Sequence, residues 1–224
     1  DFLNAVYAGK TARVSAMLQA GENPNKQDGF GNSPMTLAAY AGHAGILELL
    51  QRRGGAINIR DNFGMTPLHC AAYYDSLACA RYLLAHGAEL NATNFYGYTP
   101  LFSAIGNGYP DMAELLLQAG ASISVRDGQG WQPLHLALRS DQIKPEARMR
   151  MVALLIAHGA DPGADNPGGW EDDSNHDSTV FPLAPFQRRL ANRGNTPLAI
   201  AESNGFDDIA ELLRQLVARN TPPP

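Results

Sequence analysis

Self-similarity at a fixed step of 33 residues constrains this chain of 224 residues more than any other feature. Four kinds of position recur in one register: a glycine, a polar residue, a turn residue of the Asp/Asn type, and a residue followed by proline. The columns are Gly21, Gly54, Gly87 and Gly120; Asn25, Asn58, Asn91 and Ser124; Asp28, Asp61, Asn94 and Asp127; Ser33-Pro34, Thr66-Pro67, Thr99-Pro100 and Gln132-Pro133. Such a period indicates stacked copies of one supersecondary motif.

Each column has a physical reason. Thr66 and Thr99 suit the start of a helix, because a threonine hydroxyl accepts a hydrogen bond from a backbone N–H that has no partner inside the helix. The proline that follows takes the first helical position, where its missing N–H costs nothing. The glycine column supplies the left-handed residue that ends a second helix. We therefore expect each repeat to contain two helices and an exposed turn.

A signature inside this register points to a family. The segment Thr66-Pro67-Leu68-His69-Cys70-Ala71-Ala72 matches the T-P-L-H-x-A pattern, and the chain resembles the ankyrin repeat proteins, whose period is also 33 residues. Segments that begin at Ser33, Thr99, Gln132 and Thr196 match less fully. The resemblance implies an all-α solenoid of antiparallel helix pairs with projecting β-turn or hairpin loops and a concave groove. Because one repeat cannot bury its apolar face alone, neighbouring repeats must stack.

The register predicts a single ankyrin-repeat domain over residues 1–224. We expect six repeats, at about residues 1–31, 32–64, 65–97, 98–130, 131–194 and 195–220. The fifth repeat is abnormal, since the step from Gln132 to Thr196 is 64 residues instead of 33. We expect the extra residues near 140–146, between the two helices, and at 162–193, in the turn that follows.

The longer insertion has an acidic first half and an apolar, basic second half, and three interpretations of it stay open. It is a surface excursion that docks on the stack, a clamp that binds a partner directly, or a metal-binding or enzymatic site formed by the acidic residues 165–177. Those residues include Asp165, Glu171, Asp172, Asp173 and Asp177. The EF-hand spacing is absent, and adjacent carboxylates are more typical of a solvated loop.

Aromatic residues recur at positions that face the groove or the turn tips in ankyrin-like stacks. The chain has 8 Tyr, 8 Phe and 2 Trp, and ten of these 18 lie at such positions. The columns are Tyr7, Tyr40 and Tyr73; Phe30, Phe63 and Tyr96; and Met65, Tyr98 and Trp131, with Tyr74 and Phe95 beside them. An exposed apolar patch marks an interaction site, and Tyr and Trp anchor interfaces. Alternatively, the turn-tip rings pack on one another and stiffen the array.

We expect the partner-binding residues to be Tyr40, Phe63, Met65, Tyr73, Tyr74, Phe95, Tyr96, Tyr98, Trp131 and Trp170. His69 and His135 fall at the signature histidine, for which the resemblance implies a structural role that bridges neighbouring repeats. Cys70 and Cys79 are expected to be packed as reduced thiols, although their positions leave a disulfide conceivable. No catalytic motif is present, so the sequence predicts no catalytic residue, metal or cofactor.

Composition narrows the class of partner. The net charge is -5, which argues against nucleic acid because binding there depends on basic residues that neutralise phosphates. No apolar run is long enough for membrane insertion. Fourteen of the 17 basic residues are Arg, a bias that suggests a bacterial source and hence a bacterial cytoplasm or periplasm.

We therefore predict a non-catalytic protein-protein interaction module, most simply a monomer. It would bind its partner through the aromatic concave groove and the insertion of the fifth repeat. An inhibitor or immunity-type protein, or a bacterial effector, would be the biological form.

Overall fold

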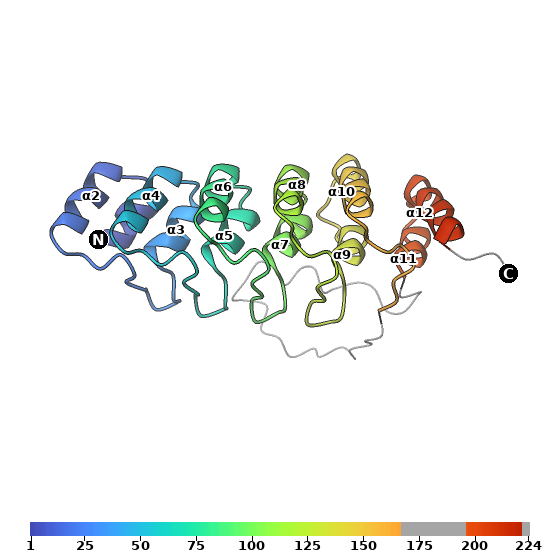
Figure 1. Ribbon diagram of the computed structural model, residues 1–224, viewed down its shortest axis with the longest axis horizontal. Coiled ribbons are helices and arrows are strands. Elements are labelled where there is room, and N and C mark those ends of the chain that lie inside the picture. The colour runs from blue at the N-terminus through green and yellow to red at the C-terminus, as the bar shows by residue number, and fades with distance from the viewer. Residues whose placement is uncertain (167–195, 221–224) are drawn as a thin grey trace. The chain divides into compact units, whose positions relative to one another are not determined.

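The computed structural model describes residues 1–166 and 196–220, and every regular element in these residues is a helix (Figure 1). The helices follow one another in short pairs. The first helices are α1 Phe2–Tyr7, α3 Pro34–Tyr40, α5 Pro67–Tyr73, α7 Pro100–Gly106, α9 Pro133–Arg139 and α11 Pro197–Ser203. The second helices are α2 Thr11–Gln19, α4 Ala44–Arg52, α6 Leu77–Ala85, α8 Pro110–Gln118, α10 Pro145–Ala157 and α12 Asp207–Asn220. The predicted all-α repeat architecture is confirmed.

Contacts divide the chain into two compact units. Unit 1 comprises Asp1–Ala104 and Asp111–Ser122, and unit 2 comprises Ile105–Pro110 and Ile123–Pro224. In unit 1, α3 packs between α1 and α5, while α4 packs between α2 and α6, so first and second helices form separate layers. In unit 2, α9 packs on α10 and α11, and α11 packs on α12. A single domain over residues 1–224 stays a prediction.

The helices begin as the sequence predicts, with one exception. The hydroxyl of Ser33 accepts from the backbone N of Thr36 at 3.1 Å, and that of Thr66 accepts from His69 N at 3.4 Å. In both helices the third residue bonds back to the cap, which completes a capping box. The prediction for Thr99 is wrong, because its buried hydroxyl has no hydrogen-bond partner. Its third helical residue is Phe102, whose side chain cannot form the reciprocal bond.

A buried leucine lies at the same register position in successive second helices. Leu50, Leu83 and Leu116 of unit 1 have no exposed surface, and Leu155 holds the matching position in unit 2. Each layer of packed side chains includes residues of the neighbouring repeat, because a nine-residue helix alone has too little apolar surface to be stable. Hydrophobic burial across repeats therefore provides the main stabilisation.

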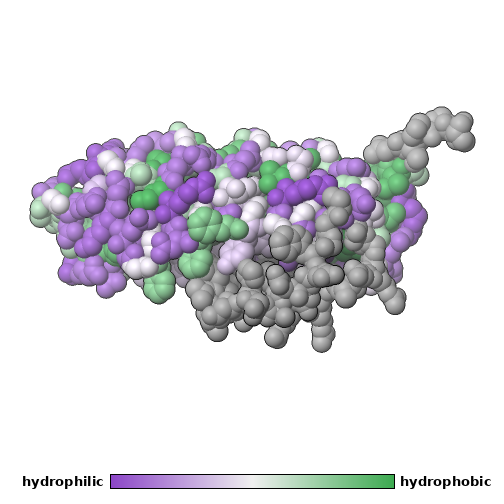
Figure 2. Space-filling model, turned by 90° about the horizontal axis from the view of Figure 1, so that it is seen from below, coloured by the Kyte–Doolittle hydropathy of each residue, from purple (hydrophilic) through white to green (hydrophobic). Residues whose placement is uncertain are grey.

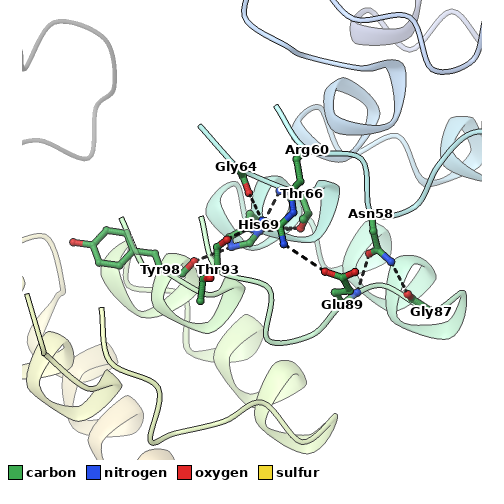
Figure 3. A network of polar contacts seen from close by, with 9 residues as sticks. All are labelled: Asn58, Arg60, Gly64, Thr66, His69, Gly87, Glu89, Thr93 and Tyr98. Carbon is green, nitrogen blue, oxygen red and sulfur yellow. Dashed lines mark hydrogen bonds and ion pairs between the residues drawn. The ribbon is translucent and has the colours of Figure 1, made fainter. Parts of the chain in front are cut away.

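The signature histidine bridges neighbouring repeats, as the family resemblance implies. His69 is fully buried, with Nδ1 2.8 Å from Thr66 Oγ1 and Nε2 2.9 Å from the carbonyl oxygen of Tyr98 (Figure 3). His135 forms the matching bridge in unit 2, with Nε2 3.1 Å from Ala164 O. Each bridge joins a first helix to a backbone carbonyl 29 residues further along the chain.

A second ladder joins the repeats at the glycines that end the second helices. Asn58 Nδ2 donates to Gly87 O at 3.1 Å, and its Oδ1 accepts from Glu89 N at 2.9 Å (Figure 3). Arg60 Nη1 donates to the carbonyls of Gly64 and Thr93, at 3.1 Å and 2.8 Å. Asn25 repeats the pattern of Asn58 one step earlier. These paired contacts fix the register of each turn against the next.

An Asp or Asn side chain shapes each projecting turn. Asp61 Oδ1 accepts from the backbone N of Phe63 and of Met65, both at 2.8 Å, and Asp61 N donates to Met65 O at 3.0 Å. The same two side-chain bonds are made by Asp28, Asn94 and Asp127. Burial raises the pKa of Asp61, although the two backbone N–H bonds act in the opposite direction.

The fifth repeat holds its extra residues differently from the prediction. The link between α9 and α10 has five residues, 140–144, against three at 74–76, and α10 has 13 residues against nine in α6. Most of the shorter insertion is therefore an extra helical turn. Arg148 holds the link in place, because its Nη2 donates to Ser140 O at 2.6 Å and Ile143 O at 3.0 Å. Residues 167–193 of the longer insertion lie outside the described residues.

Both thiols are buried and neither forms a disulfide. Burial raises the pKa of Cys70 to about 12 and that of Cys79 to about 11. The expectation of packed reduced thiols is confirmed, and the conceivable disulfide between them is absent.

Stability is expected to fall as the pH drops from about 6.5 towards 4. Burial lowers the pKa of His69 from 6.5 to about 4, so in this range the unfolded chain binds a proton that the folded chain excludes. The contribution is fully present above pH 6.5 and declines by roughly 3 kcal/mol as the pH approaches 4. Urea unfolding at several pH values measures it. His69→Gln keeps a donor for Tyr98 and should have a shallower pH dependence; equal slopes in the two proteins would contradict the prediction.

Asp61→Asn should leave the free energy of unfolding within about 0.5 kcal/mol of the wild type, whereas Asp61→Ala should lower it by about 2 kcal/mol. The amide keeps the acceptor oxygen, as Asn94 does in the next turn, but alanine leaves the N–H groups of Phe63 and Met65 without a partner. Denaturant unfolding at neutral pH compares the three proteins. A loss in the Asn variant as large as in the Ala variant would show that the charge, and not the acceptor, shapes the turn.

Candidate protein-binding surface

Two sets of aromatic side chains in unit 1 lie on the repeating framework described above. The first stands at the turn tips. Phe30 is 64% exposed and Phe95 is 75% exposed, whereas Phe63, Tyr96 and Tyr98 are half-buried. Figure 2 shows hydrophobic side chains standing among hydrophilic ones on the face that it draws.

Turn-tip rings also pack against the framework, as the alternative interpretation of the sequence anticipates. Phe95 N donates to Phe63 O at 3.0 Å, and the Phe95 ring lies over Gly64, where an added Cβ would be 3.0 Å from Phe95 Cδ1. The Tyr98 ring stacks on Phe102 with centroids 5.5 Å apart. Figure 3 shows this ring pointing away from the network that holds the Tyr98 carbonyl. Packing and exposure therefore coexist at the tips.

The second set stands where the first helices of three successive repeats end, and we call it the tyrosine row: Tyr7, Tyr40, Tyr73 and Tyr74. Ring centroids are 5.6 Å apart between Tyr7 and Tyr40, 3.8 Å between Tyr40 and Tyr74, and 4.7 Å between Tyr73 and Tyr74. Tyr7, Tyr40 and Tyr74 are 51%, 37% and 38% exposed. The row is a continuous aromatic surface held by helix ends.

Tyr74, whose ring contacts both Tyr40 and Tyr73, stays neutral at physiological pH. Burial raises the pKa of Tyr74, and a hydrogen bond with Tyr40 and the neighbouring phenols raise it further. Tyr74 therefore offers a ring face and a hydroxyl group and no phenolate charge.

Among the expected binding residues that the structure describes, Met65 alone is buried. Its side chain is 3% exposed, and Asn94 Nδ2 lies 3.2 Å from its sulfur. The next turn along the chain, which contains Asn94, therefore covers Met65, and Tyr98 and Trp131 hold the matching position in later repeats. The expectation that Met65 lines an open surface is wrong for this reason.

The remaining expected residues belong elsewhere in the chain. Trp131 lies in unit 2 and is half-buried, with the Arg139 guanidinium 4.0 Å above its ring and the His135 ring 5.3 Å away. Trp170 lies outside the described residues. Tyr7 and Phe30 are exposed but were not among the expected binding residues, although the aromatic columns of the sequence contain both.

Acidic residues gather at a shallow hollow of unit 2. Glu202, Asp207, Asp208 and Glu211 line it together with Arg214, which pairs with Glu202 at 2.8 Å and Glu211 at 2.6 Å. No aromatic residue contributes to this hollow. The aromatic concave groove therefore stays a prediction.

The alternative of a metal site rests on residues 165–177, of which the structure describes Asp165 and Asn166. Within residues 1–166 and 196–220, no three His, Cys, Asp or Glu side chains come together as ligands for a metal ion. In the same part of the chain, no helix has the length and apolar character that crossing a bilayer requires.

Comparison with known families agrees with this architecture. A model described as ankyrin repeats (3 copies) matches residues 2–94, one described as ankyrin repeats (many copies) matches residues 91–137, and a model of one ankyrin repeat matches residues 129–167. No curated protein matches the chain. Ankyrin repeats generally act as protein-protein interaction modules. The chain belongs to the ankyrin repeat family.

Proposed function

We propose that this protein is a non-catalytic interaction module that binds a partner protein through the exposed aromatic residues of unit 1. The tyrosine row carries the proposal, because three of its rings keep more than a third of their surface exposed while they touch one another. Contiguous exposed apolar surface of this kind is uncommon on a protein that does not bind another.

The chemistry of the row suits a protein surface. Each tyrosine offers a large ring, few rotatable bonds and a hydroxyl group, so it loses little entropy on binding and can still bond to a partner backbone. The Tyr40 and Tyr74 rings, 3.8 Å apart between centroids, restrain one another before any partner arrives. Preorganisation of this kind lowers the cost of association.

The turn tips extend the proposed contact. Phe30 and Phe95 project from turns whose backbone is fixed by Asp28 and Asn94. Phe63, Tyr96 and Tyr98 remain proposed contact residues of unit 1, and Trp131 remains a proposed contact residue of unit 2. We propose that the insertion of the fifth repeat acts as a clamp on the same partner, with Trp170 as part of it.

The biological form that we propose is an inhibitor or immunity-type protein, or a bacterial effector, that covers an active region of its partner. The family's general role in protein-protein interaction supports a protein that acts by covering its partner's surface and not by catalysis. The net charge of -5 favours a partner with a basic patch, whose encounter it would accelerate.

The triple variant Tyr7→Ala, Tyr40→Ala and Tyr74→Ala should lose partner capture while its fold stays intact. The three rings are exposed, so truncation removes contact surface without opening a cavity in the core. Affinity capture from the source organism, followed by mass spectrometry, compares the variant with the wild type, and thermal unfolding checks the fold.

Tyr82→Ala is the matched control, because Tyr82 lies on α6 of the same unit, stacks on His86 and is not part of the row. It should capture the same protein as the wild type. Equal capture by the triple variant and by Tyr82→Ala would refute the tyrosine row as the binding surface.

A further inference from the structure

The third repeat departs from the pattern of its own chain where its first helix ends. The residue pairs at this position are Ala8-Gly9, Ala41-Gly42, Tyr74-Asp75 and Asn107-Gly108. The three glycines have φ of 69°, 77° and 79°, and Asp75 has φ of 54°. Among the described residues, Asp75 is the sole non-glycine with positive φ. The third repeat thus has tyrosine and aspartate where the first two repeats have alanine and glycine.

The aspartate is not the residue that this backbone favours. A left-handed conformation is unstrained for glycine, whereas aspartate adopts it at a cost of roughly 1 kcal/mol. The Asp75 carbonyl accepts from Leu77 N at 3.0 Å, a bond that any residue could form. Within the part of the chain that the structure describes, no donor or cation pairs with the Asp75 carboxylate. The carboxylate is therefore not required by the turn itself.

Asp75 directly follows Tyr74, whose ring contacts both Tyr40 and Tyr73. Burial raises the pKa of Asp75, and the negative charge of Asp111 raises it further. The exposed Asp75 carboxylate thus belongs to the residue next to an aromatic side chain, and the faces of aromatic rings are themselves electron-rich. A cation is the group that such surroundings attract.

We propose that Tyr40, Tyr74 and Asp75 form a binding site for an arginine side chain of the partner protein. The site deepens the proposed function, on which it rests, by naming the chemistry that the tyrosine row recognises. A guanidinium is planar and weakly hydrated, so it can stack on a ring while its N–H groups bond to a carboxylate. A purely apolar partner residue would use the rings but would gain nothing from Asp75.

Titration of the full chain with N-acetyl-arginine amide, followed by NMR, tests the site directly. Ring resonances of Tyr40 and Tyr74 and the backbone amide of Asp75 should shift saturably, with a dissociation constant on the order of 1 mM for so small a ligand. N-acetyl-citrulline amide has the same shape without the charge and should bind at least about fivefold more weakly. Equal shifts with the two amides, or no saturable shift at Tyr74, would overturn the proposal.

Two substitutions separate the charge from the backbone. Asp75→Asn keeps the size and tolerates the left-handed conformation, and it should weaken arginine-amide binding by about fivefold or more. Asp75→Gly should weaken binding equally while its thermal midpoint stays the same or rises. Asp161→Asn is the control, because Asp161 is also an exposed aspartate in a turn, where it accepts a hydrogen bond from Gly163 N. This variant should change neither the affinity for the arginine amide nor the thermal midpoint. Unaltered binding in the two Asp75 variants refutes the site.

Partner capture distinguishes failure of this site from failure of the function. Capture that is lost in the tyrosine triple variant but retained in Asp75→Asn, with no arginine-amide binding, rejects the arginine site and leaves the interaction function standing. Capture that survives in the triple variant rejects the function itself.

Discussion

Burial between neighbouring repeats is the constraint on which the rest of the structure depends. The first helices of unit 1, with six or seven residues, and its nine-residue second helices are too short to be stable in water alone. Leu50, Leu83 and Leu116 become fully buried only because the adjacent repeat completes their surroundings. Polar groups follow the same logic, since His69 reaches the Tyr98 carbonyl of the next repeat. The fold is therefore a sum of nearest-neighbour contacts, and each repeat is positioned by those beside it.

This way of folding leaves the ends of the helices and the tips of the turns without a structural role in the core. The Asp61 carboxylate and the corresponding side chains hold the turn backbone from within, so the residues at the tips can vary. In unit 1 those positions carry Phe30 and Phe95, and the helix ends carry the tyrosine row. A rigid framework with variable aromatic residues on it is the physical basis of the binding that we propose.

Most of the fold could be predicted from the sequence because the same pattern of residues occurs in several repeats. The caps at Ser33 and Thr66, the buried His69 and the all-helical architecture follow from local rules that apply equally in every repeat. The predictions that failed concern single positions and not the repeat as a whole. Met65 is buried by Asn94 of the next turn, and Thr99 lacks the hydrogen bond of a cap although it holds the same register position as Thr66. The extra turn of α10 likewise depends on Arg148 and the carbonyls it holds, which periodicity does not reveal.

Asp75 shows how a repeat protein can reveal function without any comparison outside itself. Each repeat serves as a control for the others. A residue that the local backbone disfavours is therefore informative when the equivalent positions in other repeats have glycine, which adopts the same backbone without strain. Gly9, Gly42 and Gly108 show what this position requires for folding alone. The strain at Asp75 is small, but it coincides with Tyr74, the ring that joins Tyr40 to Tyr73. Tyrosine and aspartate stand at adjacent positions of one repeat where the first two repeats have alanine and glycine, and this favours a common functional cause for both.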